Sequence, residues 1–408
     1  MPRILMFATG FAPYAASENL VNSKLALAML GRGWDVQIIS AADEGFTYVA
    51  EWEEPWLPLR PRTCEVQHKL GNNIGKLLSR GWSSLRMGHP IAGVRWGDAA
   101  LVTALRSHDA KRFDFVLSRS ISDFGHIPAM AFHNKTGIRW FANWNDPPSY
   151  IFPEPYRYTS SSCRKFWWNR YFREVLSTSD CNTFPCQRLA NHILNHFGIN
   201  DHVKTTIIPH IGLVGYQANK KLKDSCFRLC HAGNLSSERN PRPFLEALKG
   251  LMNIMDPADS LAFEIIGVEE VYLSDMINKL GMTSVVSFLG KKSYLETLDR
   301  LARNDVLVII EAPCEEGIFM PSKLVDYVQV GRPVLAVSPL NGTVSDLINT
   351  RGGGICVNCR SVEDILTGLK TFYNVWRKDD LDSYRSINLE NLFNPDTILN
   401  LYQNLMVQ

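Results

Sequence analysis

Short apolar runs alternate with amphipathic stretches over most of the chain. Residues 3–8 are predicted as a strand, and residues 17–30 after them carry apolar side chains at helical spacing on one face. A second apolar run at 34–39 follows the glycines that end this helix, which completes a strand–helix–strand unit. Since strands buried on both faces consist of continuous β-branched runs, the pattern predicts parallel sheets covered by helices.

The alternation continues toward the C-terminus. Further strands are expected at 113–118, 227–233, 262–267, 285–290, 306–310, 334–337 and 355–357. Residues 140–148 are expected as a strand running into a loop, and residues 205–210 as a strand and turn. A chain of 408 residues exceeds one ordinary core, so we expect two domains of roughly 200 residues. We assign the first domain to residues 1–215, a linker to the polar run 217–224, and the second domain to residues 216–393, with an amphipathic helix at 394–408.

Composition and charge indicate a globular protein without a nucleic-acid partner. The chain is 45% hydrophobic and 21% charged, and its formal net charge is only +2. Nine cysteines, an odd number, argue for a reducing, cytoplasmic compartment, and Cys356-x-x-Cys359 lacks the second pair that a zinc site needs. The apolar N-terminus is interpreted as a first strand rather than a signal peptide, and no run has the length of a transmembrane helix.

Residues 68–112 differ from the rest in charge. They contain Lys69, Lys76, Arg80, Arg86, Arg95, Arg106, Lys111 and Arg112 against only Asp98 and Asp109, with leucines and Trp82 between the first of them. Such a segment can contact an anionic membrane surface or steer a phosphate-bearing acceptor. A solvated helical face explains the pattern equally well.

The stretch 315–333 combines a strand end, a glycine turn and a helix. The buried run 306–310 precedes it, so its loop should lie at the carboxyl end of a strand, where open α/β sheets bind ligands. We expect Ser322 to cap the following helix, Gly331 to end it and Pro333 to prevent its continuation. The helix N-terminus then offers unpaired N–H groups to an anion.

This stretch resembles a known family. Glu-Gly-Ile-Phe-Met-Pro at 316–321, Ser-Lys-Leu-Val-Asp-Tyr at 322–327 and Gly-Arg-Pro-Val-Leu-Ala at 331–336 are similar to the donor-site motif of family 4 of the retaining glycosyltransferases. The family carries a second Glu eight positions after the first, where this chain has Leu324. Asp326 is the nearest acid and keeps the usual distance to Gly-Arg-Pro, which fits a variant with a Pro-Ser-Lys-Leu insertion.

The resemblance implies the GT-B fold, in which two Rossmann-like, doubly wound parallel-sheet domains face a central cleft, and the C-terminal helix packs back on the first domain. It implies transfer of a sugar, with retention, from a UDP- or GDP-linked donor to a saccharide or lipid-linked saccharide, in surface polysaccharide or glycolipid synthesis at the inner face of the membrane. No metal or further cofactor is implied. A GT-B nucleotide-sugar epimerase and a non-catalytic nucleotide-sugar-binding protein are the alternatives.

The resemblance also assigns residues to the donor. Arg239 stands where the family has a lysine and Asn234 where it has an arginine, and Lys323 is our hypothesis for the missing phosphate-binding cation. The nucleoside is expected at Leu289, Gly290 and Asp326. The remaining donor-binding assignments are Gly10, Gly317, Ile318, Phe319 and Ser322.

Three residues are assigned to catalysis. Glu316 is expected to hold hydroxyls of the donor sugar, helped by backbone N–H groups of residues 317–319. His126 and Asp146 occupy loops that resemble those where the family carries a histidine and an Asp-Pro, and His126 would contact the sugar from the opposite domain. A histidine that opens a helix is more often a cap or a packed residue, so that alternative stays open.

Overall fold

The computed structural model describes residues 1–14, 16–42, 51–67, 73–87, 93–120, 124–157, 161–199, 203–218 and 225–407. The chain divides into two compact units. Unit 1 consists of Met1–Phe152, Arg157–Val214 and Pro395–Gln408, and unit 2 of Pro153–Tyr156 and Gly215–Asn394. Residues 219–224 of the expected linker and parts of the basic segment 68–112 lie outside the described residues.

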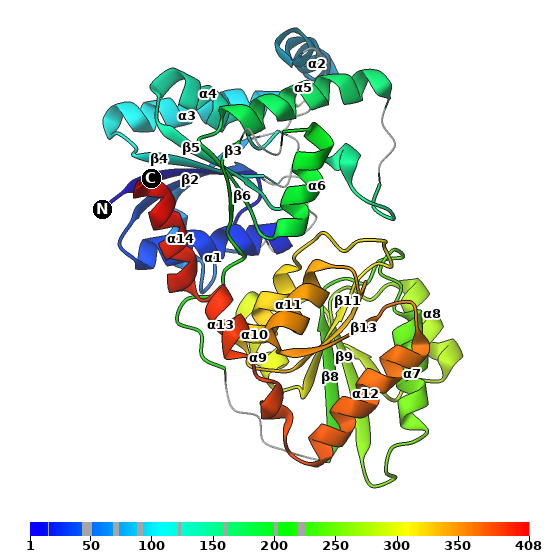
Figure 1. The fold of residues 1–408 in the computed structure, drawn as a ribbon. Coiled ribbons are helices and arrows are strands. Elements are labelled where there is room, and N and C mark those ends of the chain that lie inside the picture. Colours follow the sequence, from blue (N-terminus) through cyan, green and yellow to red (C-terminus); the bar gives the residue numbers. More distant parts are fainter. Residues whose placement is uncertain are drawn as a thin grey trace. The chain divides into compact units, whose positions relative to one another are not determined.

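Unit 1 is built on a seven-stranded parallel sheet with the order β3-β2-β1-β4-β5-β6-β7. Figure 1 shows α3 and α4 over one face of this sheet and α1 with α14 over the other. The strands are β1 (Arg3–Ala8), β2 (Asp35–Ala42), β3 (Thr63–Gln67), β4 (Phe115–Ser120), β5 (Arg139–Trp144), β6 (Cys181–Phe184) and β7 (Thr205–Ile207). The helices are α1 (Ser17–Gly31), α2 (Asn73–Met87), α3 (Val94–Ala110), α4 (Ile127–Thr136), α5 (Ser162–Thr178), α6 (Gln187–Phe197) and α14 (Pro395–Val407).

Helix α14 belongs to unit 1 although it is last in the chain. Its apolar face is buried, and the Tyr402 hydroxyl accepts a hydrogen bond of 3.1 Å from Arg119. Arg139 donates to the backbone carbonyls of Leu405 and Met406, at 3.1 and 3.2 Å. A guanidinium at this end satisfies carbonyls that the helix itself cannot pair and complements its dipole.

Unit 2 contains a six-stranded parallel sheet with the order β10-β9-β8-β11-β12-β13. Its strands are β8 (Cys226–Ala232), β9 (Ser260–Ile266), β10 (Val286–Phe288), β11 (Val306–Ile310), β12 (Val334–Ser338) and β13 (Gly354–Asn358). Its helices are α7 (Arg242–Met252), α8 (Val271–Leu280), α9 (Tyr294–Ala302), α10 (Ser322–Gln329), α11 (Thr343–Arg351), α12 (Val362–Arg377) and α13 (Ile387–Phe393). Two parallel, helix-covered sheets confirm the predicted fold class.

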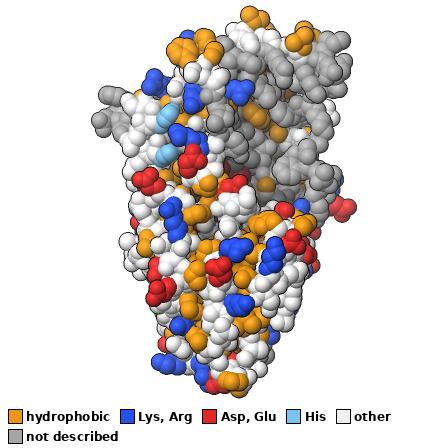
Figure 2. All heavy atoms as spheres, turned by 90° about the vertical axis from the view of Figure 1, so that its right-hand side faces the viewer, with side chains coloured by type: hydrophobic (Ala, Val, Ile, Leu, Met, Phe, Trp, Pro, Cys, Tyr) orange, Lys and Arg blue, Asp and Glu red, His pale blue; other side chains and the backbone are white. Residues whose placement is uncertain are grey.

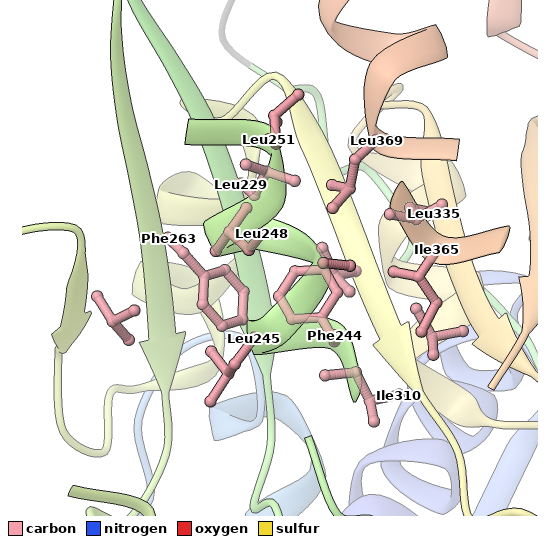
Figure 3. Close-up of a cluster of buried hydrophobic side chains, with 14 of the residues drawn as sticks. Leu229, Phe244, Leu245, Leu248, Leu251, Phe263, Ile310, Leu335, Ile365 and Leu369 are labelled. Carbon is pink, nitrogen blue, oxygen red and sulfur yellow. The ribbon is translucent and has the colours of Figure 1, made fainter. Parts of the chain in front are cut away.

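The core of unit 2 lies between the sheet and helices α7 and α12. Figure 3 shows Phe244, Leu245 and Leu248 of α7 packed on the sheet beside Ile365 and Leu369 of α12. All five side chains are fully buried. The apolar stripe of α7 thus anchors its N-terminus at the carboxyl ends of the strands.

Prolines hold the N-terminal cap positions of two helices in unit 2. Ser322 is wrong as the cap of α10, because the helix already begins at Ser322 and Pro321 holds the cap position with φ −66°. Pro241 likewise holds the cap position of α7. The Asn240 side-chain oxygen still accepts the Arg242 N–H at 3.0 Å, so it satisfies one terminal donor.

The described surface offers no broad band of one charge on the face drawn in Figure 2, where basic and acidic side chains are interspersed. Within the described ranges, no helix is long and apolar enough to cross a membrane. All nine cysteines lie in described segments and carry thiols rather than disulfides.

Candidate functional site

The loop after β11 is tied to the segment after β12 by backbone contacts. The Gly317 N–H donates to Asn341 O at 2.9 Å, and the Thr343 N–H donates to Gly317 O at 2.8 Å. A Cβ on Gly342 would lie 3.1 Å from the Cα of Gly317, so neither glycine can be replaced without moving the loop. These bonds hold the exposed Glu316 at the carboxyl edge of the sheet.

Lys323, in the first turn of α10, is fixed by a histidine on β8. Its ammonium lies 3.3 Å from Nε2 of His231, whose Nδ1 lies 2.9 Å from the carbonyl oxygen of Val308. Since a carbonyl only accepts, Nδ1 carries the proton and Nε2 accepts a hydrogen bond from Lys323. A Cβ on Gly233 would lie 3.0 Å from this ammonium, which therefore rests directly on the backbone.

Arg239 lies near Lys323, held by a tyrosine. Its Nε donates to the Tyr156 hydroxyl at 3.0 Å, and its guanidinium carbon lies 5.8 Å from the centroid of the same ring. Burial, and next the positive charge of Arg239, lower the pKa of Lys323 to about 7, against the opposing effect of Glu311. Two close cations at the end of a sheet form a site that an anion stabilises.

Glu311 follows β11 directly and is the acid of this cluster. Burial raises the pKa of its carboxyl, while the Ser338 hydroxyl, Arg239 and Lys323 act in the opposite direction. The Ser338 hydroxyl donates a hydrogen bond to its Oε2. Sequence reasoning missed Glu311, although an acid directly after a five-residue apolar strand was a usable signal.

His231 and Tyr156 were also missed. A histidine within the apolar run 227–233 was a signal for a polar role, but Tyr156 comes from a four-residue segment far from the rest of unit 2 in sequence. Its ring also packs edge-on to Phe319, with centroids 6.0 Å apart. Phe319 is half-buried, whereas its predicted neighbour Ile318 is only 1% exposed, so this side chain belongs to the core.

Two of the residues predicted for the nucleoside, Leu289 and Gly290, lie on the β10 side of the cations. Gly290, with φ +68°, and Leu289 follow β10, which is separated from β11 by β9 and β8. Asp326 accepts a hydrogen bond of 2.6 Å from the hydroxyl of Tyr294, at the start of the helix after β10. Asn234 accepts the N–H of Val268 at 3.2 Å, so its oxygen supports a neighbouring loop.

His126 is inside unit 1. It is 0% exposed, its Nδ1 lies 2.8 Å from the Ser118 hydroxyl, and its ring centroid lies 4.5 Å from that of Trp144. Burial lowers its pKa to about 3, so the imidazole is neutral. This placement agrees with the packed-residue alternative and gives no support to the expected contact with a sugar.

Gly10 and Asp146 occupy loops at the carboxyl edge of the unit 1 sheet. The Gly10 carbonyl accepts from Asn22 at 2.8 Å, and Asn22 in turn accepts from Arg119 at 2.6 Å. Asp146 follows β5 and is half-buried. Glu18 lies at the same edge, and sequence reasoning did not single it out. Burial raises the pKa of its carboxyl.

Comparison with known proteins rests on structure alone. No protein-family model matches the sequence, and no curated protein matches it significantly. Among the solved structures that match, three are described here, and each match covers nearly the whole length of both chains. Sucrose-phosphate synthase from Thermosynechococcus elongatus has a TM-score of 0.65 at 14% identity, covering 100% of this chain and 99% of that one.

The other two are S. aureus TarM in complex with fondaparinux, α-GlcNAc-glycerol and UDP, and WaaG, a glycosyltransferase involved in lipopolysaccharide biosynthesis. TarM has a TM-score of 0.65 at 12% identity, covering 100% of both chains. WaaG has a TM-score of 0.61 at 12% identity, covering 98% of this chain and 99% of its own. The chain has the GT-B fold. In this GT-B protein, the second Rossmann-like unit carries the cluster of Arg239, Lys323, His231 and Glu311 described above.

Proposed function

We propose that the protein is a retaining glycosyltransferase that moves a sugar from a UDP- or GDP-linked donor to a saccharide or lipid-linked saccharide acceptor. The observation that carries the proposal is the meeting of Arg239 and Lys323 at the ends of β8 and β11, beside the loop of Glu316. The GT-B fold and the presence of UDP and saccharides in the TarM complex support it. Retention is proposed from the resemblance of residues 316–327 to the family 4 motif.

The proposed chemistry depends on the leaving group. Glycosyl transfer releases a nucleoside diphosphate while positive charge develops on the sugar, so groups that stabilise the diphosphate lower the barrier. Arg239 and Lys323 supply two cations for it without a metal ion. Nε2 of His231 accepts a hydrogen bond from one N–H of the Lys323 ammonium and leaves the other two N–H groups to donate to phosphate oxygens. Glu316 is proposed to hold sugar hydroxyls.

A membrane contact through residues 68–112 is proposed for the acceptor side. Helix α2 exposes Leu77 by 70%, Leu78 by 65% and Leu85 by 85%, and it contains no acidic residue. Apolar side chains that point to solvent from a helix with lysine and arginine are typical of segments that lie at a lipid surface. Such a contact fits a lipid-linked saccharide or a glycolipid as acceptor.

The test measures binding first and transfer second. Thermal unfolding of the purified protein with UDP- and GDP-linked sugars should show a rise in Tm with the true donor. R239A and K323A should abolish this rise without lowering the Tm of the free protein. Release of nucleoside diphosphate that depends on an added saccharide supports transfer, whereas conversion of the donor sugar without an acceptor would point to epimerisation. Absence of any nucleotide binding would refute the proposal.

A further inference from the structure

Tyr156 belongs to a short turn that groups with unit 2 although the chain on both sides of it is part of unit 1. Pro153–Tyr156 form this turn, which we call the strap, and Phe152 and Arg157 on either side are assigned to unit 1. The Tyr156 N–H donates to the carbonyl oxygen of Pro153 at 2.9 Å, which closes the turn. The strap thus supplies a tyrosine to unit 2 from the connection between β5 and α5.

The hydroxyl of Tyr156 determines which nitrogens of Arg239 serve a ligand. Arg239 Nε donates to this hydroxyl at 3.0 Å, and the guanidinium carbon lies 5.8 Å from the centroid of the tyrosine ring, within cation–π range. Burial raises the pKa of Tyr156 against the opposing charge of Arg239, so the hydroxyl is neutral. The contact uses Nε and leaves Nη1 and Nη2, the fork that binds a phosphate through two parallel hydrogen bonds.

The ring of Tyr156 joins Arg239 to the loop of Glu316. It packs edge-on against Phe319, with the two ring centroids 6.0 Å apart. Phe319 follows Gly317, whose backbone is bonded to the segment after β12. One side chain therefore contacts both the cation proposed for the diphosphate and the loop proposed for the sugar.

Arg239 needs such a contact because of its surroundings. Its positive charge lowers the pKa of Lys323, so the two cations repel each other when no anion is bound. Arg239 is also only half-buried, and a long side chain at such a place samples several rotamers. Ordering it at the moment of binding would weaken the affinity for a ligand. A tyrosine that orders it beforehand removes this loss.

We infer that Tyr156 is a positioning residue for the leaving group, whose hydroxyl holds Arg239 so that Nη1 and Nη2 face the diphosphate. The inference rests on the proposed function, because it needs a nucleoside diphosphate as the group that Arg239 binds. It adds that a segment continued at both ends by unit 1 sets the affinity of unit 2 for its ligand.

The first experiment removes only the hydroxyl. Calorimetry with UDP and GDP compares wild type with Y156F, which keeps the ring that packs against Phe319. A hydrogen bond to a charged group is partly screened at a half-buried place, so we expect Y156F to bind the nucleoside diphosphate about 3- to 10-fold more weakly. Y384F, at a half-buried tyrosine that packs on Phe372, is the matched control and should bind like wild type. Wild-type affinity of Y156F would overturn the inference.

The second experiment asks whether the tyrosine acts through Arg239. R239K keeps the charge but lacks the guanidinium Nε and the fork. We expect the dissociation constant of R239K to change by less than about twofold when Y156F is added, because the interaction that the hydroxyl supports is already gone. Weakening by the same factor in both backgrounds would mean that Tyr156 acts on the ligand or on folding directly, which would overturn the inference.

Amide hydrogen exchange of the wild type gives a measurement that needs no variant. If the contact between Tyr156 and Arg239 favours diphosphate binding, bound diphosphate must favour that contact by the same factor. Saturating nucleoside diphosphate should therefore slow exchange in the peptide that spans the strap and leave the peptide around Tyr384 unchanged. Unchanged exchange in the strap would overturn the inference even if Y156F did not fold. A wild type that binds neither UDP nor GDP would refute the proposed function itself.

Discussion

Raising the pH from 6 to 8 should weaken nucleotide-sugar binding by about tenfold, because it removes the charge of Lys323. Burial and the charge of Arg239 bring the pKa of Lys323 to about 7 in the ligand-free protein. Only the protonated amine attracts the diphosphate, so the apparent dissociation constant scales with 1 + 10^(pH − pKa). With this pKa the factor is about 1.1 at pH 6 and about 11 at pH 8.

A nucleotide-sugar is the suitable probe because its diphosphate is substituted at both ends. It lacks the ionisation near pH 6 of a terminal phosphate, so the pH dependence reports on the protein. Calorimetry at pH 6, 7 and 8 in buffers of different ionisation enthalpy also counts the protons taken up on binding. Uptake should be largest at pH 8, where Lys323 starts unprotonated.

K323R is the control, since arginine stays charged throughout this range. Its dissociation constant should be nearly the same at pH 6 and 8. Equal affinity of the wild type at both pH values would contradict the reasoning, because Lys323 would then be charged throughout. A K323R variant with the pH profile of the wild type would instead assign the titration to another group, such as Glu311.

Three further outcomes are expected. K323M should raise the free energy of unfolding, more at pH 6 than at pH 9. The folded-state pKa lies below the unfolded value of 10.5, so the cost of the buried charge is complete below pH 7 and fades as the pH rises toward 10.5. Urea unfolding at the two pH values measures this. G233A should lower the free energy of unfolding by about 1–3 kcal/mol and also weaken donor binding, since φ is +118° and the new Cβ meets the ammonium of Lys323. G281A, at φ +68° in open space, should lose stability and keep donor affinity in the same urea and calorimetric assays. The double variant L78S/L85S should lose binding to vesicles of anionic phospholipid in a sedimentation assay, while its Tm stays unchanged. If the variant binds the vesicles as well as the wild type does, α2 has no role at the membrane.

The sequence was sufficient to predict the fold class and part of the cluster. Arg239 and Lys323 each follow a predicted strand, and both strands end at the same edge of a parallel sheet, so a common site could be expected. That they meet depends on β8 lying next to β11. This order is a long-range property, because the two strands are about 80 residues apart and are joined through β9 and β10.

The side chains that hold Arg239 and Lys323 could not be predicted either, because they too are far away in the sequence. His231 fixes Lys323 from 92 positions away, and Tyr156 holds Arg239 from 83 positions away. For His126, by contrast, a local sequence motif suggested a contact with the donor sugar. Its burial depends on Trp140 and Trp144, whose packing no local pattern reveals. The cap predicted at Ser322 differs because Pro321, with its fixed φ, can hold the position before a helix without a side-chain bond.

The membership of α14 in unit 1 has a practical consequence for dissecting the protein. A fragment that stops at Val214 would lack the helix that covers part of unit 1, and the buried Arg119 would lose the hydroxyl of Tyr402. Arg139 would likewise lose the two carbonyls that it binds. Unit 1 should therefore be produced with residues 395–408 fused through a short linker, whereas residues 215–394 alone would lack Tyr156, which holds Arg239.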